Sequence, residues 1–298
     1  MFRYSADRLP VLVLLAISAL DFSAYLFLDS WWLLAAYAGL SMYPKAFSCS
    51  YNHHHQHLSL FTRWLPNRLI EFVFALQTGI TGNTWVLHHS LGHHLNYLDQ
   101  AKDESRWMRD DGSRMGEWEY AFKTALTAYP RAWQVGQRYP RQRRVMAVMS
   151  ALTVLLVAGL VAYRPVAGFL LFVVTPLSLV VGTALATWYH HSERPTDSHF
   201  VASNNILQKF YNVLTLNLGY HTAHHYKPGV HWSLLPKLHA EIEARIPLVA
   251  YAAPGMPWKL FGESPRPLAV PPPVPVAEVT KEDTHAEGFG LVGEPSGI

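Results

Sequence analysis

Four stretches of the chain are apolar over a length that can cross a lipid bilayer as a helix. A transmembrane helix needs about 17–25 such residues. The stretches run over about residues 10–28, 31–46, 145–163 and 167–189. The second is short and ends at Pro44 and Lys45, so spanning would require local bilayer thinning or snorkelling of flanking residues. The hydropathy pattern therefore predicts four membrane spans.

The spans are joined in pairs by very short connections, which predicts two helical hairpins with both turns on the same side of the membrane. Asp29 and Ser30 separate the first pair, and residues 164–166 separate the second. A cleaved signal peptide is an alternative for the N-terminal stretch, because Arg3 and Arg8 precede its apolar run. The second span follows at once, which favours a permanent anchor.

Lysine and arginine are distributed unequally about these hairpins. The chain has 24 of them, and only Arg164 lies in a hairpin turn, which leaves 23 on or near the opposite side. Loops rich in these residues stay in the cytoplasm. We therefore predict a multi-pass protein with a cytoplasmic N-terminus, a cytoplasmic segment 49–144 and a cytoplasmic C-terminal region. In a bacterium it would lie in the inner, or cell, membrane.

A fifth apolar stretch, residues 69–87, is interrupted by polar residues such as Glu71 and Gln77. A crossing here would put an odd number of spans between the hairpins, so we expect a re-entrant or interfacial helix pair on the cytoplasmic face. The predicted fold is an all-α integral membrane protein, in which two transmembrane hairpins carry a cytoplasmic helical cap within a domain of residues 1–261. Residues 262–298 are rich in proline and are predicted to be disordered.

Composition narrows the class of protein further. Hydrophobic residues make up 50% and charged residues only 15%, whereas soluble domains carry about 25% charged residues. The single cysteine, Cys49, excludes a disulfide scaffold. A net charge of +3 without a basic stripe gives no sign of nucleic-acid binding. The unusual number is histidine, at 17 residues.

Fourteen of the histidines fall into four short segments. They are His53-His54-His55-Gln56-His57, His88-His89-Ser90-Leu91-Gly92-His93-His94, His190-His191 with His199 nearby, and His221-Thr222-Ala223-His224-His225. On an α-helix, His53 and His57 share a face, and so do His89 and His93. The spacing of the last segment, i, i+3 and i+4, also places its histidines on one face. All four segments lie next to predicted spans on one side, so the sequence predicts that they meet.

Imidazole is a ligand for zinc, copper, iron and nickel. A zinc ion takes about four ligands, so eight or nine convergent histidines are too many for one metal and suit two. Two interpretations stay open for His54, His55 and His88, as ligands or as neighbours of ligands. We interpret His231, His239 and His285 as ordinary surface or core residues. The one Glu-x-x-His spacing lies in the proline-rich tail, so the carboxylate-rich di-iron helix bundle is not the template.

Three of these segments carry a family resemblance. His53-x-x-x-His57, His89-x-x-x-His93-His94 and His221-x-x-His224-His225 resemble the three histidine boxes of the membrane-bound fatty acid desaturase superfamily. The resemblance extends over about residues 10–250. The superfamily also holds alkane and fatty acid hydroxylases, carotenoid-modifying oxygenases and acetylenases. The resemblance implies a non-haem centre of two iron ions that activates dioxygen.

The resemblance also implies a ligand set. The segment 187–192 is similar to a motif that supplies an extra ligand after the last span, with His191 as a better candidate than His190. The full set of predicted metal ligands is His53, His57, His89, His93, His94, His191, His221, His224 and His225. The first box is nearly all histidine, which leaves its ligand pair open.

Ligating imidazoles usually donate their second N–H group to an acceptor. Candidates for such an orienting partner are Asn217, Asp103 and Asp197, with Asp99 close to the second box. Asn217 precedes His221 by four residues and could instead hold a metal-bound water or be a plain helix-face residue. The alternative for the three carboxylates is a solvated loop position.

The function that the resemblance implies is an oxygen-dependent acyl-chain desaturase that takes a lipid from the membrane. The aromatic residues Tyr37, Trp85, Trp107, Trp118, Trp188 and Phe200 could line an acyl tunnel, or form an interfacial belt. No Gly-x-Gly-x-x-Gly segment or haem domain is visible. Electrons should therefore come from a separate donor such as a ferredoxin or rubredoxin. The arginines at positions 138, 141, 143 and 144 could dock an acidic donor or reflect membrane orientation.

Several alternatives remain at this stage. Hydroxylation, acetylenation or decarboxylation of a fatty acid to a terminal alkene begins with hydrogen abstraction at the same kind of site. A zinc-dependent intramembrane hydrolase is a rival from another class. A metal transporter fits poorly, because the histidines flank the spans and Asp21 is the one carboxylate inside them. The sequence leaves open the regioselectivity, chain length, acyl carrier, electron donor and oligomeric state.

Overall fold

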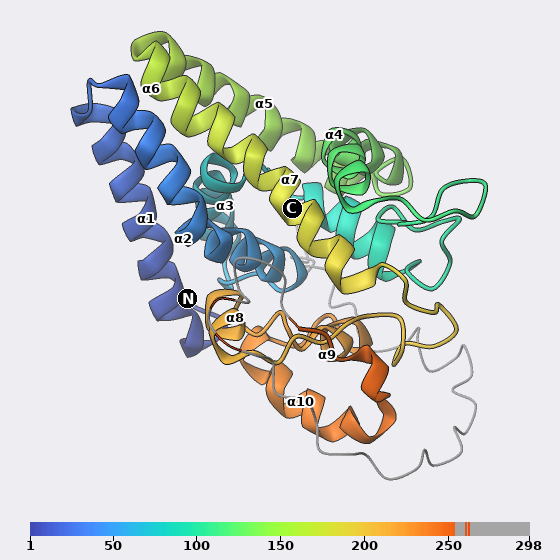
Figure 1. The fold of residues 1–298 in the computed structure, drawn as a ribbon. Helices are drawn as coiled ribbons and strands as arrows, with labels where there is room; N and C mark the ends of the chain where they lie inside the picture. The colour runs from blue at the N-terminus through green and yellow to red at the C-terminus, as the bar shows by residue number, and fades with distance from the viewer. Residues whose placement is uncertain (254–259, 261, 263–298) are drawn as a thin grey trace.

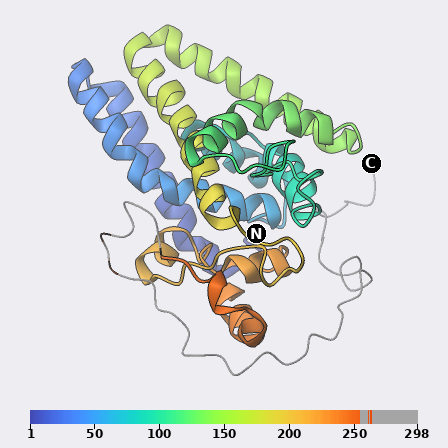
Figure 2. The same ribbon diagram turned by 45° about the vertical axis from the view of Figure 1, so that its right-hand side comes forward.

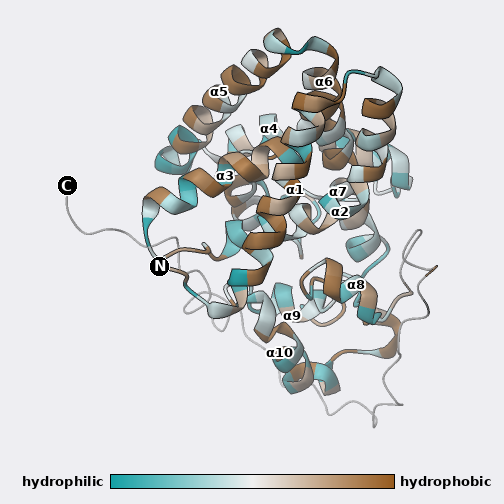
Figure 3. Cartoon of the chain, turned by 90° about the vertical axis from the view of Figure 1, so that its left-hand side faces the viewer, coloured by the Kyte–Doolittle hydropathy of each residue, from teal (hydrophilic) through white to brown (hydrophobic). Residues whose placement is uncertain are grey.

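The computed structural model describes residues 1–253, 260 and 262, and within these residues the chain is helical with no strand beyond isolated bridges. Long helices form an upper bundle, and a C-terminal layer (residues 192–253) lies beneath it (Figures 1 and 2). Hydrophobic residues dominate the long helices, whereas α9 and α10 of the C-terminal layer are more hydrophilic (Figure 3). Residues 263–298 of the predicted disordered tail, including His285, lie outside the described residues.

The first predicted hairpin consists of α1 (Arg8–Phe27) and α2 (Trp31–His57). The turn falls at Asp29 and Ser30, as predicted. The second helix does not end near Pro44 but continues through it for a total of 27 residues. A stretch of this length rises about 40 Å. The first histidine box is therefore a direct extension of the apolar helix, and His53 and His57 share one face of it, as the spacing predicted.

The second hairpin consists of α5 (Pro140–Tyr163) and a continuous helical stretch formed by α6 (Pro165–Phe169), η3 (Leu170–Val174) and α7 (Thr175–His191). Among the residues that the structure describes, three helices are long and apolar enough to cross a membrane, which marks the chain as a membrane protein. They are Ser5–Phe27, Pro140–Tyr163 and Pro165–His191. The predicted span 31–46 is not among them, because aromatic residues, Pro44 and Lys45 lower the mean hydropathy of α2.

Arg164 joins the two hairpin turns. Its guanidinium donates to the backbone oxygens of Tyr25 at 2.6 Å and Leu28 at 3.1 Å, and it pairs with Asp29. The last carbonyls of a helix have no partner within that helix, so this arginine satisfies the C-terminal end of α1. Both turns lie at the same end of the helix bundle, and the only basic residue in the turns has a structural role there.

A buried ion pair connects α1 with α2. Lys45 Nζ lies 2.9 Å from Asp21 Oδ1, and both side chains are almost fully buried. The hydroxyl of Tyr37 donates to the same carboxylate oxygen at 2.9 Å. The one acidic residue inside a predicted span is therefore neutralised within its own hairpin.

The segment between the two hairpins forms α3, η2 and α4, which together pack against helices of both hairpins. Helix α3 (Trp64–Thr78) packs against α2, α5 and α7, and ends at Gly79 with a φ of 72°. A Cβ at Gly79 would lie 2.9 Å from the Val180 side chain and 3.0 Å from the Pro176 oxygen, so only glycine fits. A turn then leads to η2 (Val86–His94), and α4 (Glu117–Val135) follows. The expected helix pair over residues 69–87 is thus the end of α3 and the start of η2.

The C-terminal layer is built from short helices. They are α8 (Lys209–Leu214), α9 (His221–Tyr226) and α10 (Leu235–Ile242), with single turns at Trp232–Leu234, Glu243–Arg245 and Leu248–Ala250. Apolar residues such as Phe200, Ala223 and Leu238 form its own small core. This layer presents α9 to the end of the bundle at which α2 and α7 stop.

We expect Lys45→Met to destabilise the protein strongly. It would leave the Asp21 carboxylate buried without its cation, and breaking one side of a buried pair costs about 3–5 kcal/mol. The melting temperature of the purified protein in detergent should fall, and the double variant Asp21→Asn with Lys45→Met should recover most of the loss. Equal melting temperatures for the single and double variants would contradict this role of the pair.

Candidate metal centre

Eight histidines from four separate elements converge where the bundle meets the C-terminal layer. The first group, called here the five-histidine cluster, consists of His53, His57, His89, His94 and His224. The second, the three-histidine cluster, consists of His93, His191 and His225. Within each cluster one ring nitrogen of every member lies within 4.8 Å of those of the others. Seven of the eight side chains are buried, and His57 is partly buried.

The Nε2 atoms of several members come very close to one another. In the five-histidine cluster the pairs are His53 with His224 at 2.9 Å, and His89 with His94 at 3.0 Å. In the other cluster, His191 lies 3.3 Å from His93. The ninth predicted ligand, His221, also approaches His191 Nε2, at 3.0 Å.

The second box does not follow the α-helical spacing that the sequence suggested. Residues Val86–His94 form a π-helix, in which positions five apart are brought together. His89 therefore shares a cluster with His94, five residues later. The sequence placed His89 and His93 on one α-helical face, and their ring centroids do lie 5.1 Å apart, but the wider turn assigns His93 to the other cluster.

The third box is also divided between the clusters. On the short helix α9, His224 joins the five-histidine cluster, while its neighbour His225 joins the three-histidine cluster. The two clusters are adjacent, because the rings of His94 and His225 stack with their centroids 4.0 Å apart. One six-residue helix thus bridges both candidate sites.

The donor set fits two bound metal ions. Two imidazole nitrogens that bind one ion at about 2.1 Å lie about 3.0–3.4 Å apart at neighbouring positions, and about 4.2 Å apart at opposite ones. The Nε2 contacts of both clusters match these separations. Among the described residues, the buried Nε2 atoms of His57 and His225 have no hydrogen-bond partner. Such atoms are costly in a protein interior unless a ligand satisfies them.

Burial keeps these imidazoles in the form that binds metals. Burial lowers the pKa of His57 to about 3, with smaller contributions from the neighbouring His54 and His93. For His94 and His225, burial and then the adjacent histidines hold the pKa well below its usual value. These three rings are therefore neutral at pH 7, and a neutral imidazole is the state that ligates a metal.

Hydrogen bonds to the Nδ1 atoms turn several rings toward the clusters. His93 donates its Nδ1–H to Asp103 Oδ1 at 2.7 Å, and this carboxylate is in turn held by the backbone N–H of Ser105 at 2.7 Å. His191 donates its Nδ1–H to the backbone oxygen of Ala202 at 3.1 Å. Each bond fixes the tautomer in which Nε2 carries a free lone pair.

The other two candidate orienting residues are not brought to the clusters. Asn217 has a φ of 62° and donates to the backbone oxygen of Trp232 at 3.2 Å. Asp197 is exposed on a bend. Asp99 is also exposed and pairs with Lys102. Of the three candidates, only Asp103 contacts a clustered histidine, because the loop after η2 folds back beneath that helix.

Two histidines next to the clusters use both ring nitrogens elsewhere. His190 donates from Nδ1 to the Asn204 oxygen at 3.0 Å and accepts at Nε2 from the Tyr211 hydroxyl at 2.8 Å. His55 accepts at Nδ1 from the backbone N–H of Leu60 and donates to Glu71, both at 3.3 Å. Neither ring has a nitrogen free for a metal.

His54 and His88 are buried but belong to neither cluster. His231 and His239 also lie apart from both. His231 donates to Asp7 at 3.1 Å, and His239 lies 3.2 Å from the Tyr251 hydroxyl.

One residue near the site carries no signal in the sequence. Asp7 is buried and accepts hydrogen bonds from Tyr51 at 3.2 Å, from the indole of Trp232 at 2.9 Å and from His231. Tyr51 precedes the first box by two residues, and His231 follows the third. This carboxylate therefore links the elements that carry both boxes, and nothing in the local pattern around it could have predicted that.

Tyr97 is a second residue that sequence reasoning missed. It is buried, its ring centroid lies 4.3 Å from that of His225, and its hydroxyl donates to His199. The tyrosine forms part of the wall that separates the three-histidine cluster from solvent. Tyr97 follows His94 by three residues, and this spacing alone does not predict a contact with the histidines.

We expect His89→Ala to abolish metal binding at the five-histidine cluster, because it removes an Nε2 from the cluster interior. The matched control is His88→Ala, which removes a buried imidazole one residue away that belongs to neither cluster. Metal content of the two purified variants, measured by elemental analysis, tests the assignment. Equal metal loss in both variants would contradict it.

We expect Asp103→Asn to weaken metal binding by about 10–100-fold, the usual effect of removing a partner of a ligating histidine. The matched control is Asp99→Asn, a carboxylate of the same loop that is exposed and pairs with Lys102. Competition with a metal chelator measures both affinities. Unchanged affinity in Asp103→Asn would show that this hydrogen bond does not orient a ligand.

Comparison with known proteins accounts for this arrangement. Residues 29–254 match the family described as Fatty acid desaturase. Neither the curated proteins nor the solved structures gave a match. The matched region covers most of the chain and contains every histidine of the two clusters. The chain therefore belongs to the fatty acid desaturase family.

Proposed function

We propose that this protein is an oxygen-dependent, non-haem di-iron desaturase that introduces a carbon–carbon double bond into the acyl chain of a membrane lipid. Family membership supports an oxidoreductase of the desaturase or hydroxylase type that acts on acyl chains. The observation that carries the finer proposal is the pair of adjacent clusters made only of histidines, seven of them buried and His57 partly buried.

The number of histidines favours iron over zinc. Protein zinc sites are almost always four-coordinate, whereas the larger cluster offers five imidazoles around one point. Iron accepts imidazole ligands and higher coordination numbers. The proposed ligands are the eight clustered histidines and His221, whose Nε2 atom lies 3.0 Å from that of His191.

Two bound iron ions would supply the dioxygen activation that attack on an unactivated C–H bond requires. The chain's own part is to hold and shield the site. Asp103 and the Ala202 backbone oxygen keep protons on the Nδ1 atoms of His93 and His191, which leaves their Nε2 atoms free. Tyr97 and the buried histidines exclude water from the interior.

The proposal also includes the side of the membrane on which the histidine clusters lie and the source of the electrons for the reaction. The ends of α2 and α7 that carry clustered histidines lie away from the turn between α5 and α6 (Figure 1). We assign the histidine end to the cytoplasmic side of a multi-pass protein. Electrons would come from a separate donor such as a ferredoxin or rubredoxin. Arg138 and Arg141 are exposed near the start of α5 and could receive an acidic donor.

The test is to reconstitute the purified chain with a reduced donor system, dioxygen and a panel of acyl substrates, and to identify products by mass spectrometry. We expect a product lacking two hydrogens, and about two iron ions per chain. A product that contains an inserted oxygen atom would show that the enzyme is a hydroxylase and would contradict desaturation. A triple bond or a shortened terminal alkene would favour the other oxidative alternatives. One zinc with no iron would support the hydrolase instead.

A further inference from the structure

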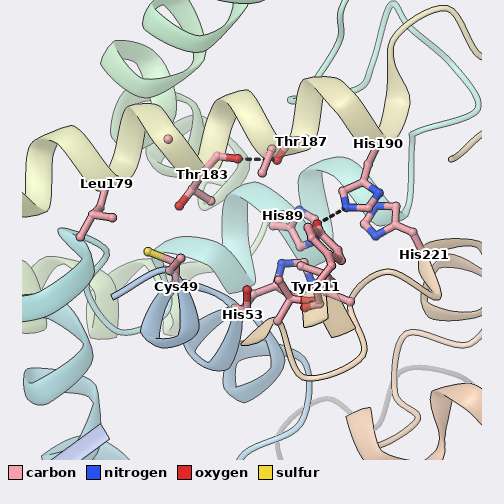
Figure 4. Close-up of a pocket in the computed structure, with 15 residues that line it drawn as sticks. Cys49, His53, His89, Leu179, Thr183, Thr187, His190, Tyr211 and His221 are labelled. Atoms are coloured by element: carbon pink, nitrogen blue, oxygen red, sulfur yellow. Dashed lines mark hydrogen bonds between the residues drawn. The ribbon is translucent and has the colours of Figure 1, made fainter. Parts of the chain in front are cut away.

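A cavity of about 190 Å³ lies between α2 and α7 and reaches the five-histidine cluster. Its inner end is lined by His53 and His89 of the five-histidine cluster, and by His190 and His221 next to the three-histidine cluster. Figure 4 shows these rings at one end, and Cys49 and Leu179 toward the other. The cavity therefore connects the candidate metal centre with a wall that belongs to the long helices.

The outer part of the cavity is framed by very small residues on α7. Gly182 and Ala186, one turn apart, both line it and are both exposed. A Cβ at Gly182 would meet no heavy atom within 4 Å, so the absent side chain leaves open space. Leu179, one turn earlier, and Ala46 on α2 complete an apolar rim.

This opening lies along a membrane-spanning helix rather than at its end. Gly182 is inside the candidate span Pro165–His191. It precedes His190 by eight residues, a distance of about 12 Å along the helix axis. A molecule that uses the opening would approach from the hydrocarbon region of the bilayer.

The cavity lining is uncharged. The residues that line it, within the described part of the chain, include no Lys, Arg, Asp or Glu. The polar groups present are hydroxyls, such as Ser50 and Thr183, and the histidines. Burying an unpaired charge is very costly, so a phosphate or carboxylate headgroup has no place inside. The lining suits the hydrocarbon portion of a lipid alone.

We propose that this cavity is a lateral port, through which the hydrocarbon chain of a bilayer lipid passes between α2 and α7 to reach the five-histidine cluster. Gly182 and Ala186 keep the port open, and the headgroup stays outside. This assignment rests on the proposed function for the identity of the substrate. It adds the route, entry of an acyl chain from the side, within the membrane, rather than of a water-soluble acyl thioester from the aqueous phase.

The experiment uses the full chain in phosphatidylcholine vesicles and acyl probes with a photoactivatable diazirine near the methyl end. Three probes carry the same chain: a phosphatidylcholine, a free fatty acid and a water-soluble coenzyme A thioester. After irradiation, labelled peptides are mapped by mass spectrometry. The informative sites are Cys49 and Tyr211, which line the cavity and are buried from lipids that merely surround the protein.

We expect Gly182→Phe to remove most of the labelling at these buried sites, because its ring fills the opening. The matched control, Gly159→Phe, places the same ring on the exposed face of α5, where a Cβ also meets open space. A second variant, Ala186→Leu, should narrow the same opening. Melting temperature and metal content identify any variant that fails to fold.

Labelling by phosphatidylcholine or by the free fatty acid supports the port and tells which membrane source it uses. Labelling of the cavity by the thioester alone, or labelling that Gly182→Phe and Ala186→Leu leave intact, would overturn it. The measurement requires no turnover. If Gly182→Phe blocks labelling but no double-bond product forms, the proposed function alone is contradicted. If a double-bond product forms but Gly182→Phe does not affect labelling, the port alone is contradicted.

Discussion

Eight imidazole rings gather in this protein, and in three pairs of them the Nε2 atoms approach to 2.9–3.3 Å. Uncharged rings can be held this close, whereas protonated rings would repel one another strongly at such distances in a medium of low dielectric constant. The arrangement therefore depends on burial that keeps the rings neutral. It also depends on a framework stiff enough to hold four separate chain segments in register.

That framework is fastened at several levels. At one end of the bundle, Arg164 ties the two hairpin turns together. Within the first hairpin, Lys45 and Asp21 neutralise each other. At the histidine end, the Asp7 carboxylate joins the first-box helix to the segment after the third box. Each contact restricts how far the box-bearing elements can move, and a stiff scaffold is what a precise ligand set needs.

Helix α7 connects the membrane with the chemistry. Its C-terminal end supplies His191 to the three-histidine cluster, and His190 to a hydrogen-bonded position beside it. About two turns earlier the same helix presents Gly182 on the cavity wall. Because both residues lie on one continuous helix, the distance between the proposed ligand His191 and the cavity opening at Gly182 is fixed.

The sequence by itself determined the apolar hairpins, the shared side of their turns and the clustering of histidines, because hydrophobic periodicity and residue spacing act locally. Only the tertiary structure decided how the histidines divide. Spacing predicts which histidines act together only when the helix type is known, and in the π-helix at Val86–His94 it is His94, not His93, that joins the cluster of His89. The role of Asp103 rather than Asp197, and the contacts of Asp7 across more than two hundred residues, depend on how distant segments pack. A local pattern carries no information about partners so far apart in the chain.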